Sequence, residues 1–255
     1  MQANMKRFAL FFLFLCSYLW KLIPSRLRLG LFTTFILLES RGRNVSYSLD
    51  RLFAIKDRTD WIINERAMVY GNGEHPKHKL TLYHDFFIER IRTEARVLDV
   101  GCGYGAVARS VAQALPNSVV LGIDLNPFQI NQAKQSLNPS NLSFIVGDAT
   151  KSLPTGPWDV IILSNCLEHI SARVDLLKTL VRVTEAHQVL IRIPLFERDW
   201  QMALRKEIGT SYFSDPDHKI EHTLDEFYGE LSAANLAVTE IKTLWGEIWA
   251  NCHVR

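Results

Sequence analysis

Three glycines at alternate positions, directly after a short apolar run, constrain this chain more than any other feature. The run from Val97 to Val100 predicts a strand buried in a parallel sheet, and Gly101, Gly103 and Gly105 follow it. Glycines let a backbone turn tightly and approach a ligand that any Cβ would block. Helical spacing begins at residue 106, so the loop opens onto a helix N-terminus, which favours polar or anionic ligand groups. The loop also fits a dinucleotide site or a turn without a ligand.

Further apolar runs alternate with helical spacing along the rest of the chain. The predicted strands that follow the loop cover residues 119–124, 142–146, 158–165, 187–194, 236–241 and 244–250. Predicted helices cover residues 128–135, 175–185 and 200–208, and Thr223 with Glu226 forms a capping box at the start of another helix. This alternation predicts an α/β fold with a doubly wound, mostly parallel sheet, whose ligands lie at the carboxyl ends of the strands.

Four groups of residues at the predicted strand ends resemble the class I S-adenosylmethionine-dependent methyltransferases. They are Asp99-x-Gly101-x-Gly103-x-Gly105, Asp124, Gly147-Asp148-Ala149 and Asn165-x-Leu167-Glu168-His169. Their order and spacing carry the resemblance, which covers residues 95–250. The resemblance implies a Rossmann-like methyltransferase fold with a seven-stranded sheet, in which the last two strands pair antiparallel and the seventh lies between the fifth and sixth.

The resemblance also implies a cofactor, S-adenosylmethionine, and residues that would hold it. These are Asp99, Gly101, Gly103, Asp124, Leu125, Asp148, Ala149 and Asn165. The two glycines would leave room for the methionine portion, while Asp99 orients its ammonium group and Asn165 lies close to the transferred methyl. Asp124 would hold the ribose, as its spacing of about 20 residues from the loop independently suggests. Leu125, Asp148 and Ala149 would contact the adenine.

The turn after the fourth predicted strand carries candidate groups for activating an acceptor oxygen. His169 could serve as a general base there, and we predict His169 and His222 as catalytic residues. Glu168 and His169 resemble part of a Glu-x-x-Glu-His element that holds Mg²⁺ in some methyltransferases, with His218 and His222 as possible distal ligands. Asn165 replaces the first glutamate of that pattern, so no metal ligand is assigned. A purely structural turn stays open as an alternative.

Residues 195–222 are the most individual part of the chain. Four aromatic residues, Phe196, Trp200, Tyr212 and Phe213, lie among charged side chains. The resemblance implies that this insertion forms the acceptor pocket, where aromatic rings could stack on a sugar or a flat ring. An amphipathic helix packed on the sheet edge is the alternative.

The N-terminal residues 1–43 are basic and apolar. They hold seven of the 29 basic residues but only one of the 27 acidic residues. The apolar stretch of residues 8–20 is shorter than the roughly 20 residues that a spanning helix needs. We predict a membrane-surface anchor. A signal peptide is disfavoured because no small-residue cleavage site follows the apolar stretch, and a lipoprotein site at Cys16 is disfavoured because Leu15 is too large for the preceding position. A helical extension packed on the protein or on a second subunit stays open as an alternative.

Residues 44–94 are predicted to form a helical lid. It comprises a linker over 40–56, helices over 57–70 and 79–91, and a loop between them. His75, His78 and His84 could contact the substrate or remain solvated. The methyltransferase domain would then span residues 95–255.

The charge distribution and the cysteine content limit which partners and which cellular compartment are expected for this protein. The chain beyond residue 43 is net acidic, which argues against nucleic acid as a partner. Its four cysteines lack metal or disulfide spacing, which favours a cytoplasmic location, at the inner face of a membrane if the anchor forms. We therefore expect methyl transfer to oxygen of a small molecule or a saccharide or lipid-linked acceptor of the cell envelope. A non-catalytic protein of the same fold that binds the donor or a partner is the alternative.

Overall fold

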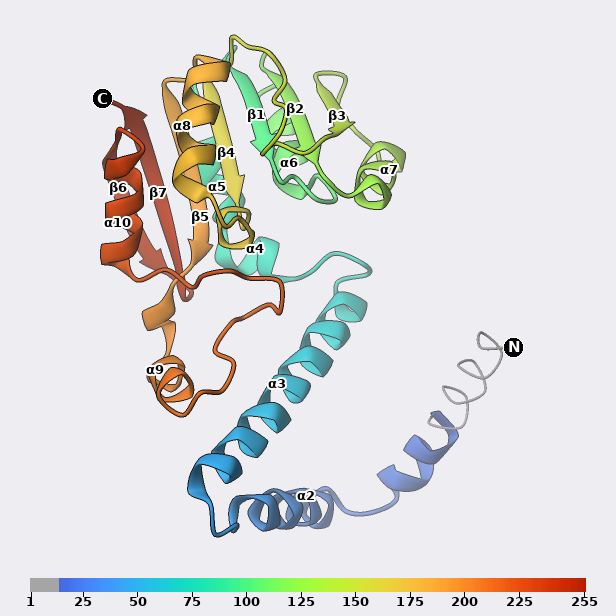
Figure 1. Ribbon diagram of the computed structural model, residues 1–255. Helices are drawn as coiled ribbons and strands as arrows, with labels where there is room; N and C mark the ends of the chain where they lie inside the picture. The colour runs from blue at the N-terminus through green and yellow to red at the C-terminus, as the bar shows by residue number, and fades with distance from the viewer. Residues whose placement is uncertain (1–13) are drawn as a thin grey trace. The chain divides into compact units, whose positions relative to one another are not determined.

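The computed structural model describes residues 14–255 and divides the chain into two compact units, residues 1–70 and 71–255 (Figure 1). The start of the predicted anchor, residues 1–13, lies outside the described residues. The two units are described separately below.

The second unit is built on a seven-stranded sheet with the order β3-β2-β1-β4-β5-β7-β6 (Figure 1). The strands are β1 (Arg96–Val100), β2 (Val119–Asp124), β3 (Leu142–Val146), β4 (Val160–Ser164), β5 (Gln188–Pro194), β6 (Leu236–Leu244) and β7 (Glu247–Val254). Strands β1 to β5 pair in parallel, and β7 pairs antiparallel with both β5 and β6. The predicted doubly wound, mostly parallel seven-stranded fold is therefore confirmed.

Helices cover both faces of this sheet. The α-helices of this unit are α4 (Lys77–Thr81), α5 (Tyr83–Ile88), α6 (Ala106–Ala114), α7 (Pro127–Gln135), α8 (Arg173–Thr184), α9 (Trp200–Glu207) and α10 (Leu224–Ala233), of which α4 and α9 lie beyond the end of the sheet (Figure 1). Helices α8 and α10 contribute to one apolar core, whereas α5, α6 and α7 contribute to the other. Successive side chains of a strand point to opposite faces, so Leu98 and Ile161 enter the first core while Val97 and Ile162 enter the second.

Two segment boundaries differ from the sequence prediction. The helix predicted over 79–91 is interrupted at Leu82, whose φ of 55° is left-handed, and becomes α4 and α5. The last two strands are longer than predicted, because the chain reverses at Trp245 and Gly246. Both residues have positive φ, 56° and 76°, as the tightest hairpins require. Leu244 therefore ends β6 and does not begin β7.

Within residues 14–70, the first unit consists of three helices joined by short turns. A helix over residues 14–21 precedes α2 (Ser25–Ser40), and Trp20 contacts Phe32 of α2 edge to face, with ring centroids 5.6 Å apart. Helix α3 (Val45–Tyr70) begins inside the segment predicted as a linker. The reason is Asn44, whose side-chain oxygen accepts a hydrogen bond from the Tyr47 N–H at 3.1 Å and so caps the helix.

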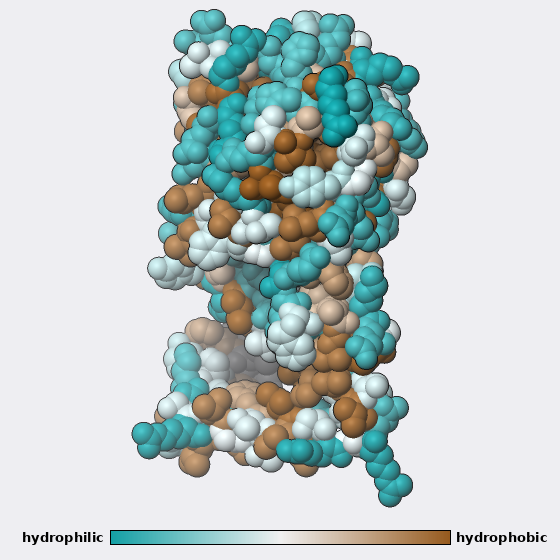
Figure 2. Space-filling model, turned by 90° about the vertical axis from the view of Figure 1, so that its left-hand side faces the viewer, coloured by the Kyte–Doolittle hydropathy of each residue, from teal (hydrophilic) through white to brown (hydrophobic). Residues whose placement is uncertain are grey.

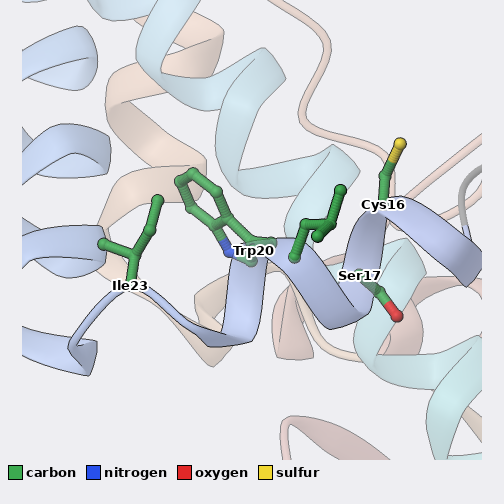
Figure 3. Close-up of a pocket in the computed structure, with 5 residues that line it drawn as sticks. Cys16, Ser17, Trp20 and Ile23 are labelled. Carbon is green, nitrogen blue, oxygen red and sulfur yellow. The ribbon is translucent and has the colours of Figure 1, made fainter.

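The surface of the first unit is rich in apolar side chains. Helix α2 buries none of its residues, and Figure 2 shows brown, apolar side chains gathered over this unit in the lower part of the view. A shallow hollow on the preceding helix is lined by Cys16, Ser17, Leu19, Trp20 and Ile23 (Figure 3). Within residues 14–255, no helix is both long and apolar enough to cross a membrane.

Candidate functional site

The candidate site lies at the carboxyl ends of β1 and β4, which are neighbours in the middle of the sheet. The chain runs from β1 outward to β2 and β3 and then returns to the other side of β1 to form β4. At such a reversal the connections leave in opposite directions, so a crevice opens beyond the strand ends. The glycine loop and the turn after β4 both lie at this edge.

The three loop glycines all have left-handed backbones, but they serve different needs. A Cβ on Gly101 (φ 73°) would lie 2.7 Å from the Cys166 sulfur, and one on Gly105 (φ 75°) would lie 2.4 Å from the Phe144 ring. A Cβ on Gly103 (φ 54°) would meet only the side-chain oxygen of Gln129, at 3.7 Å. Gly101 and Gly105 are therefore required by the packing of the chain itself, and Gly103 is the glycine with open space above it.

Asp124 ties this loop to the end of β2. Its Oδ2 accepts a hydrogen bond from the Gly103 N–H and its Oδ1 accepts one from the Asn126 N–H, both at 2.8 Å. Leu125, the next residue, is exposed. The structure thus brings Asp124 and Leu125 to the glycine loop, while their contacts with ribose and adenine stay predictions.

Asp148 and Ala149 follow the neighbouring strand β3. The Asp148 carboxylate accepts from the Thr150 hydroxyl at 2.6 Å and pairs with the Lys151 ammonium at 2.9 Å. Hydrogen bonds from Thr150 and then from Lys151 lower the pKa of Asp148 to about 2. Asp148 is therefore an ionised acceptor at neutral pH, and its predicted contact with an adenine amino group stays a prediction.

Among the predicted donor-binding residues, two buried oxygen atoms have no hydrogen-bond partner within residues 14–255. They are Oδ2 of Asp99 on β1 and Oδ1 of Asn165 directly after β4. Burial raises the pKa of Asp99 to about 7. Asn165 adopts a left-handed backbone (φ 52°), and its N–H donates to the Arg192 carbonyl at 2.7 Å. Buried acceptors without partners are rare in proteins, and an ammonium group placed at the carboxyl ends of β1 and β4 would supply the missing donors.

A second group of residues next to Asn165 was not predicted from the sequence. Arg192 of β5 is buried, donates to Glu247 of β7 at 2.7 Å, and lies 3.8 Å from the centre of the Tyr83 ring. The Tyr83 hydroxyl in turn lies 2.5 Å from Nδ1 of His78. The only sign of this group in the sequence was Arg192, a charged residue inside the apolar run of β5. These contacts extend the site wall from β5 to α4 and α5.

The other two histidines of the predicted lid have different partners. The backbone N–H of Lys77 donates to Nδ1 of His75 at 3.1 Å. Nδ1 of His84 lies 2.7 Å from the Ser110 hydroxyl, and burial lowers the pKa of His84 to about 4, so its ring is neutral at physiological pH. His84 also joins the wall described above, because its ring meets the Tyr83 ring edge to face at 4.3 Å and lies 5.1 Å from the His78 ring.

The turn after β4 brings three candidate groups together. Glu168 and His169 belong to the short helix η1 (Leu167–His169), and one ligand atom from each of Glu168, His169 and His218 lies within 4.8 Å of the others. The rings of His169 and His218 meet edge to face at 4.6 Å. Burial raises the pKa of Glu168 to about 7 and lowers that of His169. No metal ligand was assigned from the sequence, and the structure brings these three residues together in one cluster.

His222 stands apart from this cluster. Its side chain is fully buried, and Nε2 lies 3.0 Å from a Glu230 oxygen that belongs to an ion pair with Arg173. The His222 carbonyl accepts from the Phe196 N–H at 2.8 Å. A general base must reach the acceptor proton, so this enclosed position argues against the catalytic role predicted for His222. The residue instead joins the insertion to α8 and α10.

The aromatic residues of the insertion pack on one another. Phe196 and Tyr212 meet edge to face at 5.6 Å, Tyr212 stacks on Phe213 at 4.6 Å, and the Lys206 ammonium lies 5.3 Å from the Phe196 ring. Trp200, at the start of α9, is exposed. The predicted acceptor pocket stays a prediction, because this aromatic packing is compatible with a pocket wall and with a purely structural insertion.

Comparisons with known proteins agree with this fold. The family profile described as a methyltransferase domain matches residues 97–187. Malonyl-[acyl-carrier protein] O-methyltransferase 1 of Ilyobacter polytropus is 25% identical over 64% of this chain and 60% of its own length. Ribosomal protein L11 methyltransferase of Thermotoga neapolitana is 31% identical over 52% of this chain and 50% of its own length. The chain thus spans about half to three-fifths of these curated relatives.

A solved structure shows the same architecture. Magnesium protoporphyrin IX methyltransferase from Synechocystis, with bound SAH, superposes with a TM-score of 0.54 at 14% identity, over 70% of this chain and 83% of its own. The sheet order and the glycine loop define a nucleoside-binding α/β domain of the methyltransferase class. The chain carries a class I S-adenosylmethionine-dependent methyltransferase domain, and S-adenosylmethionine is the cofactor of that class.

Proposed function

We propose that this protein transfers a methyl group from S-adenosylmethionine to an oxygen atom of a small molecule or of a saccharide or lipid-linked acceptor in the cell envelope. The observation that carries the proposal is the pair of unpartnered, buried oxygens on Asp99 and Asn165. When bound, S-adenosylmethionine supplies a methyl group already activated by its sulfonium. The protein's own task is then to hold donor and acceptor in line.

In this proposal each residue at the strand ends has one task. Asp99 and Asn165 accept hydrogen bonds from the ammonium group of the donor, and Asp124 accepts from its ribose hydroxyls. Leu125, which is exposed beside the loop, packs on the adenine, whose amino group donates to Asp148. Ala149 offers its backbone to the same ring.

His169 is the proposed general base for the acceptor hydroxyl. It is exposed, follows β4, and has a lowered pKa, so its imidazole is neutral at pH 7 and can accept a proton. The two relatives named above act, by their names, on malonyl-[acyl-carrier protein] and on ribosomal protein L11, so relatives of this kind differ in acceptor. The envelope acceptor rests instead on the charge and the apolar surface of this chain.

Calorimetry with the demethylated product of the donor, S-adenosylhomocysteine, tests the donor site. We expect the wild-type protein to bind it and Asn165→Ser to bind it at least tenfold more weakly, because a hydrogen bond to a charged group contributes about 1.5–3 kcal/mol. Asn235→Ser is the matched control, since Asn235 is an exposed asparagine that also has a left-handed backbone (φ 60°). Failure of the wild-type protein to bind this compound would overturn the proposed function.

The acceptor class needs a second measurement. Incubation of the protein with methyl-labelled donor and membrane extract should place the label in a saccharide or lipid fraction. Label found in nucleic acid only, or in soluble protein only, would contradict the proposed acceptor while leaving the donor site intact.

We further propose that the first unit contacts an anionic membrane surface. Helix α2 exposes large apolar side chains along its length. Basic residues lie near its start (Arg26 and Arg28) and beyond its two ends (Lys21, Arg41 and Arg43). An exposed apolar helix flanked by positive charge suits the interface of an anionic bilayer. Such contact would bring the protein to an acceptor that is itself bound to the membrane.

A further inference from the structure

We propose that Glu168, His169 and His218 bind a divalent transition-metal cation at the carboxyl end of β4. One ligand atom of each residue lies within 4.8 Å of the other two. The three residues come from two segments, η1 and the insertion, which a backbone hydrogen bond joins: the Lys219 N–H donates to the Glu168 carbonyl at 2.7 Å. The site is thus assembled by the fold and not by one stretch of sequence.

Glu168 is the strongest sign of a missing partner. Its side chain is fully buried, and neither carboxylate oxygen has a hydrogen-bond partner in the described chain. A buried carboxylate that lacks any partner is costly, and proteins normally pair such a group or use it to coordinate a metal. A cation between the two histidines would neutralise the carboxylate and occupy the lone pairs that it leaves free.

His218 is oriented as a metal ligand should be. Its Nδ1 lies 2.9 Å from Glu221 Oε1, a carboxylate that also accepts from the Ser214 N–H at 2.6 Å and from Arg198 at 2.7 Å. Glu221 is therefore anionic and fixed, and it accepts the Nδ1 proton of His218. That tautomer leaves the lone pair on Nε2 free for a cation, which is the arrangement that a second carboxylate enforces around metal-bound histidines.

The donor set decides the kind of cation. Two imidazole nitrogens and one carboxylate suit zinc, manganese, iron and similar ions, whereas magnesium and calcium prefer oxygen ligands alone. His169 is exposed while Glu168 and His218 are buried, so further coordination positions would face solvent. If the proposed methyl transfer holds, an acceptor hydroxyl bound at such a position would lose its proton more easily. The cation would then activate the hydroxyl in place of His169, because a metal-bound imidazole has no free lone pair to accept a proton. Metal binding itself does not depend on that function.

The test uses the full chain without an affinity tag, stripped with a chelator and dialysed. We expect Zn²⁺ titrated by calorimetry to bind with a stoichiometry of one, and Co²⁺ to give the visible absorption of a site with nitrogen and oxygen ligands. Glu168→Gln and His218→Gln should each weaken Zn²⁺ binding at least tenfold. His187→Gln, which changes an exposed histidine of the same unit outside the cluster, should leave it unchanged.

A second variant keeps the result interpretable if the ligand variants unfold. Glu221→Gln retains the ligands but loses the carboxylate behind His218, and we expect Zn²⁺ to bind about 10–100-fold more weakly. Binding of S-adenosylhomocysteine, measured on every variant, reports folding and the donor site independently of the metal. Absence of stoichiometric Zn²⁺ and Co²⁺ binding, or equal binding by the wild-type protein and Glu168→Gln, would overturn the metal site and leave the proposed function standing. Metal binding without binding of S-adenosylhomocysteine would support the metal site and overturn the proposed function.

Discussion

At the scale of single residues, Asp99 combines a buried position with a charge-dependent task. Its Oδ2 atom lacks a partner, and burial raises its pKa to about 7. At pH 6 most of the Asp99 carboxyl is therefore protonated, and at pH 8 most of it is ionised. An ammonium group binds the ionised form more strongly, because only that form attracts a positive charge.

Binding of S-adenosylhomocysteine should consequently strengthen about tenfold between pH 6 and pH 8, in proportion to the ionised fraction of Asp99. Asp99→Asn should bind more weakly at pH 8 and lose most of this dependence. Asp175→Asn, at an exposed acid in the first turn of α8, should retain it. Calorimetry over that range measures both quantities, and a dependence equally strong in Asp99→Asn would assign the titration to another group.

The sequence predicted that most of the proposed donor-site residues lie at strand ends, because strand ends are local features. Asp99, Asp124, Asp148 and Asn165 each follow an apolar run, and parallel strands bring their carboxyl ends to one edge. The separate tasks of the glycines could not be predicted, since Cys166 and Phe144, which exclude a Cβ at Gly101 and Gly105, come from distant segments. The wall formed by Arg192, Tyr83 and His78 could not be predicted for the same reason, because its residues also come from distant segments.

At the scale of elements, the chain after β5 is held to α8 and α10 by a partly buried group of polar and charged side chains. Arg173 of α8 and Glu230 of α10 form an ion pair at 2.6 Å, and His222 lies 3.0 Å from the same carboxylate. Burial tends to raise the pKa of Glu230, but hydrogen bonds from His222 and Arg173 outweigh it and lower the pKa to about 2. Sequence reasoning did not find this cluster, because its members lie on separate elements and share no spacing.

A carboxylate whose pKa is depressed on folding stabilises the protein above its unfolded-state pKa and loses that contribution as the pH falls toward its folded-state pKa. For Glu230 this window runs from about 4.5 down to about 2. Glu230→Gln should therefore lower the free energy of unfolding by about 2–3 kcal/mol at pH 7, and the difference from the wild type should shrink below pH 4.5.

Urea unfolding of both proteins at pH 7, 5, 4 and 3 measures this difference. The difference between the two proteins is measured because other acids with depressed pKa values, such as Asp148 and Glu240, are protonated as the pH falls. Their protonation lowers the free energy of unfolding of both proteins equally. Glu185→Gln, at an exposed acid just beyond α8, controls for loss of charge alone. A difference that stays constant from pH 7 to pH 3 would show that Glu230 acts through packing and not through its charge.

At the scale of the whole molecule, the chain joins a complete methyltransferase sheet to a helical unit with a very different surface. The sequence predicted the α/β unit well, because alternating apolar runs and polar strand ends determine it locally. It predicted the start of α3 poorly: residues 40–56 were interpreted as a linker because they are polar, yet α3 begins at Val45. Polar residues are compatible with a helix whose sides are mostly exposed, so composition alone could not distinguish the two.

The apolar surface of α2 leads to a prediction for the full chain. Leu27, Phe35 and Leu38 are each more than 60% exposed on this helix, which buries none of its residues. Exposed apolar side chains favour insertion into a bilayer interface, and each nearby Lys or Arg adds about 1 kcal/mol of attraction to an anionic surface. The protein should therefore sediment with vesicles that contain phosphatidylserine and much less with purely zwitterionic vesicles, and added salt should weaken the association.

Replacing Leu27, Phe35 and Leu38 together by serine should release the protein from both kinds of vesicle, because the buried apolar area is lost. Leu137→Ser, at a highly exposed leucine of the second unit, should change nothing. Replacing Arg26 and Arg28 by glutamine should weaken only the preference for the anionic vesicles. Light scattering on the same proteins supplies the decisive alternative. If the wild-type protein ignores vesicles and is a dimer that the triple serine variant dissociates, α2 packs on a second copy of the chain and the proposed membrane contact is wrong.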